Sequence, residues 1–218
     1  MAFNTQLDVL PQSQRALWAE LEAIPDNFVL YGGTAIALRL GHRSSVDFDF
    51  FSSAPVDVDR LFADVSCLAD SEILQRAPNT LTVSVDRTEP VKISFFGEIG
   101  FGRVGSPELT NDGVLRVASL LDLLGTKLKV LLQRIEQKDY LDIEAILRSG
   151  VRLEDGLGAA ARLYGVQFPP MDCAKTLAYF DEDSLTNLPD CTKKYLVQAV
   201  GDWAGKVVDV PLLSDALV

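Results

Sequence analysis

The stretch FVLYGGTAIALRLGHRSSVDFDFF, residues 28–51, decides the fold. Residues 27–31 form a short apolar run closed by two glycines, which is typical of a buried strand. The segment TAIALRL that follows predicts a short helix ended by Gly41. Residues 46–51 alternate between acidic and apolar side chains, which predicts a second strand. The stretch therefore predicts a strand, a glycine turn, a helix and a strand in direct succession.

The segments on either side complete a two-part chain. Before the stretch, residues 11–24 predict one amphipathic helix; after it come a helix from Val56 and two alternating strands, 80–86 and 91–96. Beyond Leu115 only helical patterns follow, the first opened by Ser119 and Asp122 in a capping-box arrangement. Its apolar positions are spaced as in a helix, and further helices are predicted near 139–148, 154–164, 171–180 and 191–206. We expect an α+β fold: a lobe over 1–114 with a small mixed sheet flanked by helices, then a helical lobe over 115–218.

Composition excludes several classes of protein. The chain has 218 residues, 48% of them hydrophobic, so it can bury a sizeable core. Its formal net charge of −11 excludes a general nucleic-acid coat but leaves room for RNA at a local basic patch. No apolar run reaches the ~18 residues of a membrane span, and the N-terminus lacks the pattern of a signal peptide.

The cysteines and the histidine do not indicate a disulfide framework, a zinc site or a catalytic triad. The three cysteines form no C-x-x-C pair, and their odd number argues against a disulfide framework. The single histidine, His42, favours neither a zinc site nor triad catalysis. We expect a cytoplasmic protein whose phosphoryl chemistry, if any, uses carboxylates and a metal.

Asp47 and Asp49 are the candidate metal ligands. Residues i and i+2 of a strand point to the same face, so the two carboxylates lie ~7 Å apart along one side. Such a pair can hold a hard divalent cation, which would also relieve the repulsion between the two charges. The alternative reading is an ordinary polar strand face in water.

Gly32, Gly33 and Thr34 are the candidate phosphate-binding turn. Glycine lets the backbone approach a ligand, and the N-terminus of the following helix offers free N–H groups and the positive end of its dipole. Thr34 could cap that helix or bond a phosphate oxygen; the alternative is an ordinary turn with a threonine cap. Combined with the carboxylate pair, the turn predicts a site for a nucleoside triphosphate and its Mg²⁺.

These residues resemble a known family. The order Gly-Gly-Thr, helix, Arg43-Ser44-Ser45 and Asp47-Phe48-Asp49 is similar to DNA-polymerase-β-type nucleotidyltransferases, and more narrowly to AbiEii/AbiGii toxins. Residues 120–147 resemble that group's K…R…KD..D helical motif, and residues 175–189 its Tyr-Phe-Asp segment. The resemblance covers about 27–205.

The resemblance implies an activity, partners and residue roles. It implies Mg²⁺-dependent transfer of a nucleotide from an NTP to an acceptor, which for a toxin could be tRNA or another RNA, with a separate antitoxin protein as partner. Asp47 and Asp49 would hold the metal, and the catalytic set would be Asp47, Asp49, Lys127 and Asp139. The nucleotide would meet Gly32, Gly33, Thr34, Arg43, Lys92 and Arg134.

One position departs from the superfamily pattern. A third carboxylate is expected on a later strand, but the facing position of VKISFF is Ser94, with Lys92 on the same face. Glu89 and Glu98 flank this strand and are alternatives for the missing acid. Two other functions stay open. Ser94 and the acidic surface allow a nucleotide-binding or protein-interaction module without turnover, and the net negative charge suits an antibiotic-type transferase acting on a small cationic molecule.

The helical motif and a glycine-rich pattern also have purely structural explanations. If one helix ran through Lys127, Arg134 and Lys138, it would carry a basic stripe, which could equally be a solvated face. Asp139 could cap the next helix, with Asp142 paired to Lys138. The G-x-G-x-x-G match at 100–105 is followed by loop residues, which argues against a dinucleotide site.

Overall fold

The predicted strand–turn–helix–strand forms in the computed structural model, which describes residues 2–218. Its elements are β2 (Val29–Tyr31), α2 (Gly32–Leu40) and β3 (Asp47–Phe51). Helix α2 ends, as predicted, at Gly41, whose φ is +66° and whose N–H donates to the Ala37 carbonyl at 2.8 Å. Glycine takes this left-handed conformation without a side-chain clash, so the residue that ends the helix is the one the sequence indicates.

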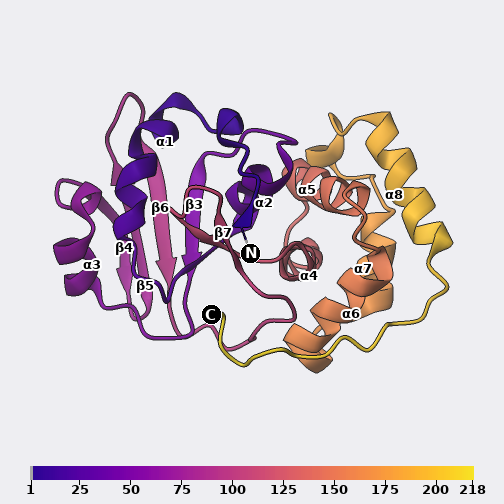
Figure 1. The fold of residues 1–218 in the computed structure, drawn as a ribbon. Coiled ribbons are helices and arrows are strands. Elements are labelled where there is room, and N and C mark those ends of the chain that lie inside the picture. Colours follow the sequence, from indigo (N-terminus) through magenta and orange to yellow (C-terminus); the bar gives the residue numbers. More distant parts are fainter. Residues whose placement is uncertain (1) are drawn as a thin grey trace. The chain divides into compact units, whose positions relative to one another are not determined.

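A mixed sheet of eight strands surrounds this stretch (Figure 1). Its order is β1-β7-β8-β2-β3-β6-β5-β4. The two predicted later strands form as β5 (Thr80–Val85) and β6 (Val91–Phe96). Four strands were not expected from the sequence: β1 (Ala2–Phe3), β4 (Glu72–Ala77), β7 (Glu108–Thr110) and β8 (Arg116–Val117). All six residues of β4 are exposed, so no apolar alternation marks this edge strand, and the other three are too short to show a period.

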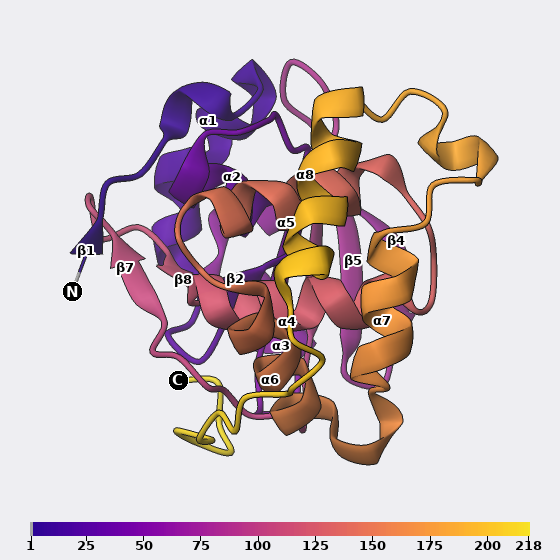
Figure 2. The ribbon, with the colours of Figure 1, turned by 90° about the vertical axis from the view of Figure 1, so that its right-hand side faces the viewer.

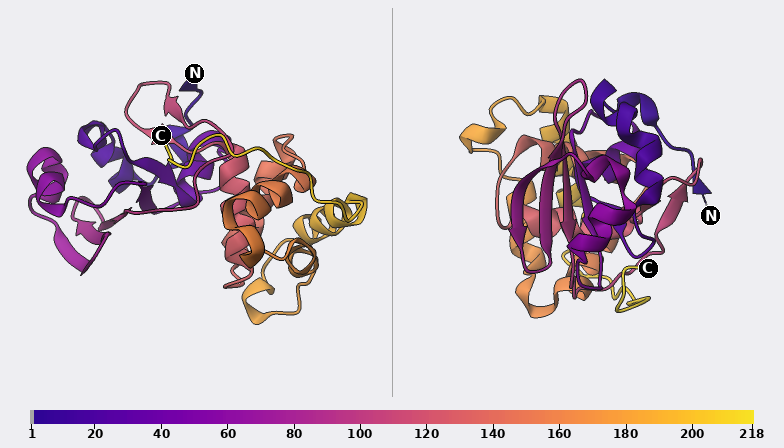
Figure 3. Two further views of the ribbon diagram at one scale, coloured as in Figure 1. Left: turned by 90° about the horizontal axis from the view of Figure 1, so that it is seen from below. Right: turned by 90° about the vertical axis from the view of Figure 1, so that its left-hand side faces the viewer.

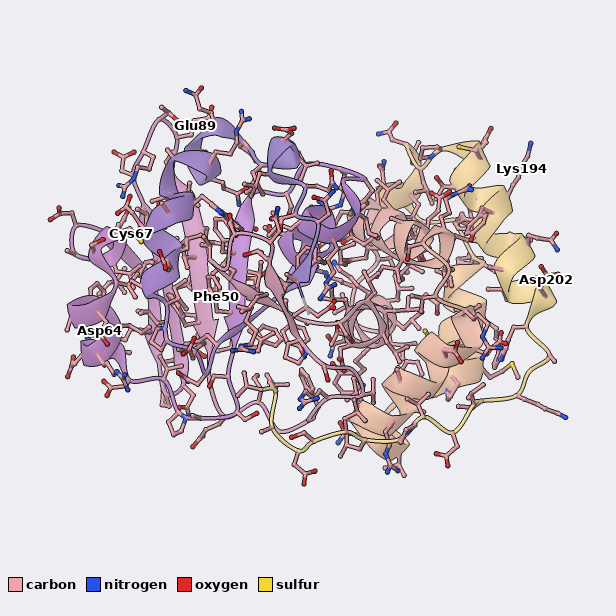
Figure 4. All side chains as sticks on the ribbon, viewed as in Figure 1. Phe50, Asp64, Cys67, Glu89, Lys194 and Asp202 are labelled. Carbon is pink, nitrogen blue, oxygen red and sulfur yellow. The ribbon has the colours of Figure 1, made fainter. Side chains whose placement is uncertain are left out.

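The central strands have one apolar and one polar face. Strand β3 is antiparallel to β2 and parallel to β6, and β6 is antiparallel to β5. Phe50 of β3, labelled in Figure 4, stacks on Phe95 of β6 with 5.4 Å between ring centroids. Both rings are buried in the core, together with Phe48, Leu81, Val83 and Ile93. The opposite face of the same strands carries acidic, basic and hydroxyl side chains, and it contains the candidate site.

The N-terminal helical segment differs from the single helix predicted over 11–24. Helix α1 (Gln12–Leu17) stops early, and the chain continues as the 3₁₀ segment η2 (Trp18–Ala23). The predicted apolar stripe is nevertheless buried, with Leu17 and Leu21 fully covered. Helices this short are stabilised by packing more than by propensity, so burial decides their geometry. The remaining short helices here are η1 (Leu7–Val9), α3 (Val58–Asp64) and η3 (Ser66–Leu68). Helix α3 lies at the left end of the left-hand view in Figure 3.

A buried amide in α1 predicts a stabilising substitution. Gln14 is 1% exposed, and within residues 2–218 neither its amide nitrogen nor its oxygen has a hydrogen-bond partner. A buried polar group without a partner costs about 1–3 kcal/mol, whereas an apolar side chain of similar shape avoids that cost. Gln14→Met is therefore expected to raise the free energy of unfolding by about 1 kcal/mol. An unchanged or lower urea midpoint, compared with the exposed control Gln12→Met, would contradict this.

Helices α4 to α8 build the second part of the chain, and Figure 2 shows them facing the viewer. Helix α4 packs against α5, α6 and α7, while α8 packs against α5 and α7. Lys194 and Asp202, labelled in Figure 4, lie along the outer helix α8. The bounds are α4 (Leu120–Leu131), α5 (Gln137–Arg148), α6 (Leu153–Tyr164), α7 (Pro170–Leu177) and α8 (Asp190–Asp202), with 3₁₀ turns η4 (Gly165–Gln167) and η5 (Asp183–Leu185).

The chain divides into two compact units, which we call the sheet unit and the helical unit. The sheet unit comprises residues 1–102, 106–119 and 214–218, and the helical unit residues 103–105 and 120–213. The C-terminal residues return to the sheet unit, where the Leu217 N–H donates to the Ser53 hydroxyl at 3.1 Å. No helix among residues 2–218 is long and apolar enough to cross a membrane.

Candidate functional site

The carboxylates of Asp47 and Asp49 share the polar face of β3. The intervening Phe48 and the following Phe50 are buried on the other face, so the strand alternation predicted from VDFDFF is present. Asp47 keeps 36% of its side chain exposed. Asp49 lies beside Tyr31 of β2. Buried phenylalanines thus fix the register that turns both acids toward the same side.

The neighbouring strand β6 places a cation and a hydroxyl next to this pair. In the parallel register Lys92 lies opposite Asp47, and Ser94 lies opposite Asp49. The Lys92 Nζ is 3.1 Å from Oδ2 of Asp47, and Ser94 is 3% exposed. Over residues 2–218 no group of three or more histidine, cysteine or acidic side chains is arranged to hold a metal. The position expected for a third carboxylate is therefore filled by a buried serine.

The glycine turn, whose Gly32 and Gly33 are the first two residues of α2, packs directly against these side chains. Gly32 has a φ of +75°, and a methyl group on it would lie 2.8 Å from Oδ2 of Asp49. A methyl group on Gly33 would lie 2.5 Å from an Arg43 guanidinium nitrogen. Only glycine combines this backbone conformation with so close an approach. The first turn of α2 therefore lies in close contact with the Asp49 carboxylate and the Arg43 guanidinium.

Thr34 is placed differently from the cap that the sequence suggested. It is the third residue of α2 and 1% exposed, and Tyr31 occupies the N-cap position. Its hydroxyl contacts the Asp47 carbonyl and lies 2.9 Å from the Ser45 hydroxyl. Thr34 therefore connects the beginning of β3 to α2. Ser45, part of the Arg43-Ser44-Ser45 motif to which the sequence assigned no role, belongs to this network. The Arg43 guanidinium also donates to the Ser44 carbonyl at 2.9 Å.

In the helical unit, Lys127 is the centre of a buried ion cluster. Its Nζ lies 2.6 Å from Oδ1 of Asp139 and 2.7 Å from Oδ2 of Asp142. Both aspartates are fully buried, and the lysine is 7% exposed. The prediction that Asp142 pairs with Lys138 is wrong, because Asp142 points to α4 and Lys138 pairs with Glu136 at 2.9 Å. The cluster ties α4 to α5 through three buried charges.

The break between α4 and α5 reorganises the predicted basic stripe. Helix α4 ends at Leu131 and α5 begins at Gln137, so no single helix runs through Lys127, Arg134 and Lys138. The Arg134 Nε instead donates to Oδ2 of Asp139 at 3.1 Å, while its side chain stays 47% exposed. Asp139 is inside α5 and its N-cap is Glu136, so the predicted cap is also corrected. Asp139 thus joins a buried lysine to a half-exposed arginine.

A cavity that the sequence gave no signal for lies beside Arg134. Its volume is about 470 Å³, and its walls come from the α4–α5 loop and from the segment after α7. Arg134 and Glu182 line it together with Ser184, whose hydroxyl donates to the Ile135 carbonyl at 2.7 Å. Close to these groups, burial and nearby negative charges raise the pKa of Tyr140 to about 12, so its hydroxyl stays protonated and donates to the Thr176 carbonyl. Thr176, Glu182 and Ser184 belong to residues 175–189, so the Tyr-Phe-Asp segment forms one wall of this cavity.

The glycine-rich loop at 100–105 opens no helix, as the sequence predicted. Its last two residues donate their backbone N–H groups to the buried Asp122 carboxylate, Val104 at 2.8 Å and Gly105 at 3.0 Å. Asp122 therefore anchors this loop to α4, a contact that the capping-box pattern did not indicate.

Known proteins are similar to this chain in sequence and in fold. Residues 15–190 match the family described as nucleotidyl transferase AbiEii toxin of a type IV toxin–antitoxin system. An uncharacterized protein of Aquifex aeolicus (strain VF5) is 33% identical over 127 residues, which are 57% of this chain and 60% of that relative. The chain thus covers about three fifths of the relative's length.

A crystal structure of a candidate nucleotidyltransferase from H. pylori matches with a TM-score of 0.58 at 17% identity, covering 87% of this chain and 92% of that one. This similarity confirms the predicted fold class, an α+β nucleotidyltransferase fold. Because the family match extends over most of the sequence, from residue 15 to residue 190, the chain belongs to the AbiEii nucleotidyltransferase toxin family.

Proposed function

We propose that the chain transfers a nucleoside monophosphate from an NTP to an acceptor hydroxyl with the help of Mg²⁺. The observation that carries the proposal is the carboxylate pair Asp47 and Asp49 on the polar face of β3, next to the glycine turn that opens α2. Two carboxylates are the ligand type that Mg²⁺ prefers, and Mg²⁺ commonly takes one or two of them plus substrate phosphates. When bound there, the ion would neutralise charge on the triphosphate.

The chain's own groups would orient the phosphates and the attacking oxygen. The N-terminus of α2 offers N–H groups at Gly32 and Gly33 to phosphate oxygens, and Arg43 adds a positive charge beside them. The acceptor oxygen attacks the α-phosphorus in line, the bond to the bridging oxygen breaks, and pyrophosphate leaves as the hydroxyl proton passes to solvent. Most of the rate enhancement would come from positioning and charge stabilisation.

The helical motif would contribute through Arg134 more directly than through Lys127. Lys127 is held by two buried carboxylates, whereas Arg134 is half-exposed at a cavity and is fixed by Asp139. We therefore propose that Arg134 is the cation of this motif that meets a ligand, and that Asp139 and, through it, Lys127 hold Arg134 in position. This reverses the order of importance that the motif alone suggests, because burial limits which cation can reach a ligand.

Membership of a toxin family supports a biological role in growth inhibition. The acceptor would then be an RNA, with tRNA as the first candidate, and a separate antitoxin protein would counteract the chain. Ser94 favours a second candidate, a module that binds nucleotide without turnover, because serine supplies neither a base nor a strong ligand at neutral pH. The two candidates differ in whether pyrophosphate is released once NTP is bound.

Nucleotide binding tests the metal assignment. We expect the wild-type chain to bind NTP with Mg²⁺ and to lose most of that affinity when EDTA removes the metal. Asp47→Asn should lose the Mg²⁺-dependent part, because one of the two anionic ligands is gone while the strand register is unchanged. The matched control is Asp59→Asn, an aspartate whose side chain is 97% exposed in the same unit. Equal Mg²⁺-dependent binding by Asp47→Asn and Asp59→Asn would contradict the proposal.

A further inference from the structure

We infer that the site holds one divalent cation, with the Lys92 ammonium taking the place of a second. This inference rests on the proposed function, because it concerns the same two carboxylates. The inference goes beyond the proposed function by assigning the number of ions and by giving Lys92 the role of a built-in counter-ion.

The strand register limits the negative charge to two carboxylates. Asp49 has two cross-strand neighbours, Tyr31 on β2 and Ser94 on β6, and both are neutral. Across β6, the next residue on the same face beyond Ser94 is Thr82 of β5, again neutral. A serine hydroxyl is a much weaker partner for a hard dication than a carboxylate. The polar face therefore offers two anionic ligands on one strand and no anionic one on the strands beside it.

Lys92 lies where a second cation would otherwise balance the pair. Its Nζ is 3.1 Å from Oδ2 of Asp47. The strand pairing places the backbone of Lys92 between Asp47 on β3 and Ser84 on β5. The two carboxylates and the Lys92 ammonium sum to −1, and the Arg43 guanidinium beside the glycine turn adds a further positive charge. One divalent ion therefore already makes the group positive. A second divalent ion would add to a positive charge and would face the ammonium directly, which opposes its binding.

The lysine does not prevent the first ion from binding. Lys92 is 44% exposed and Asp47 36% exposed, so water screens their attraction. The long stem of lysine lets the ammonium move away from Oδ2 while remaining beside the site. Lys92 can then turn toward phosphate oxygens, which agrees with its expected place among the nucleotide-binding residues.

Counting bound Mn²⁺ by electron paramagnetic resonance tests the inference without any turnover. Mn²⁺ alone is titrated into the full chain, and the free ion signal gives the number bound. We expect one Mn²⁺ per wild-type chain, and one in Lys92→Arg, which keeps the charge. Lys92→Met should still bind one, with affinity raised by up to about fivefold, the most that a half-exposed ion pair contributes. The double variant Lys92→Met/Ser94→Asp should bind two ions with a spin-coupled spectrum.

The outcomes separate the inference from the proposed function. Two ions on the wild-type chain, lost in Asp47→Asn, would overturn the inference and leave the proposed function standing. Unchanged affinity in Lys92→Met, or a single ion in the double variant with a native circular dichroism spectrum, would also overturn it. No Mn²⁺ bound by the wild-type chain would contradict both. Lys92→Met/Ser84→Asp is the matched control, since its added acid lies one strand further away and should leave one ion bound.

Discussion

Replacing Lys127 with methionine is expected to lower the free energy of unfolding of the helical unit by about 3–5 kcal/mol. The ammonium is the shared partner of Asp139 and Asp142, which are both fully buried. Without it, two carboxylates stay in the core without the ammonium that they share, with the half-exposed Arg134 beside Asp139, and uncompensated buried charge is costly. Urea denaturation followed by Trp203 fluorescence, in a Trp18→Phe background, would report on this unit.

Two further variants sharpen this measurement. Lys129→Met is the matched control, because Lys129 is on the same helix but its ammonium donates to the Gln167 carbonyl and lies 5.6 Å from the Tyr164 ring centroid, with no ion pair to a carboxylate of residues 2–218. Its expected cost is about 1 kcal/mol or less. Adding Asp142→Asn to Lys127→Met should recover part of the loss, since one uncompensated charge is removed. If Lys127→Met unfolded at the same urea concentration as Lys129→Met, the cluster would not be what holds α4 to α5.

Gly32→Ala is expected to abolish most Mg²⁺-dependent nucleotide binding, with a loss of roughly 100-fold. Two effects combine at this residue: a φ of +75° strains any L side chain, and the added methyl group would lie 2.8 Å from Oδ2 of Asp49. The carboxylate must then move away from its place beside Asp47. Equilibrium binding of NTP at fixed Mg²⁺ measures the effect directly.

Gly113 provides the control for backbone strain. Its φ is +79°, yet a methyl group on it would meet no atom within 4 Å. Gly113→Ala should therefore share the strain cost of about 1–2 kcal/mol in stability but keep its nucleotide affinity. Equal nucleotide affinity in the two variants would show that contact with Asp49 does not matter for binding.

The parts of the site that depend on local periodicity could be predicted from the sequence. The alternation of VDFDFF sets the faces of β3, so it places Asp47 and Asp49 together, and Gly41 ends α2 as expected. The alternation of VKISFF likewise placed Ser94 and Lys92 on the same face. In each case one strand or one helix contains all the information that the prediction needs.

The parts that depend on contacts between elements could not be predicted. The partners of Lys127 are on a different helix, and no glycine or proline marks the break after Leu131. The close approach of Gly32 to Asp49 and the role of Thr34 depend on how α2 packs against β3. Strand β4 was missed because an exposed edge strand has no buried side to give it a period. These features follow from tertiary packing, which a helical or strand period does not encode.

The central claim is that Asp47 and Asp49 support nucleotide transfer, and label transfer tests it most directly. The chain is incubated with Mg²⁺, total cellular RNA and each of the four α-³²P-labelled NTPs in turn, beside Asp47→Asn and Asp59→Asn. The account predicts a labelled RNA band with at least one NTP, present in Asp59→Asn and absent in Asp47→Asn. A band of equal strength in Asp47→Asn would contradict the account, and bound NTP with neither label transfer nor pyrophosphate release would identify a binding module instead.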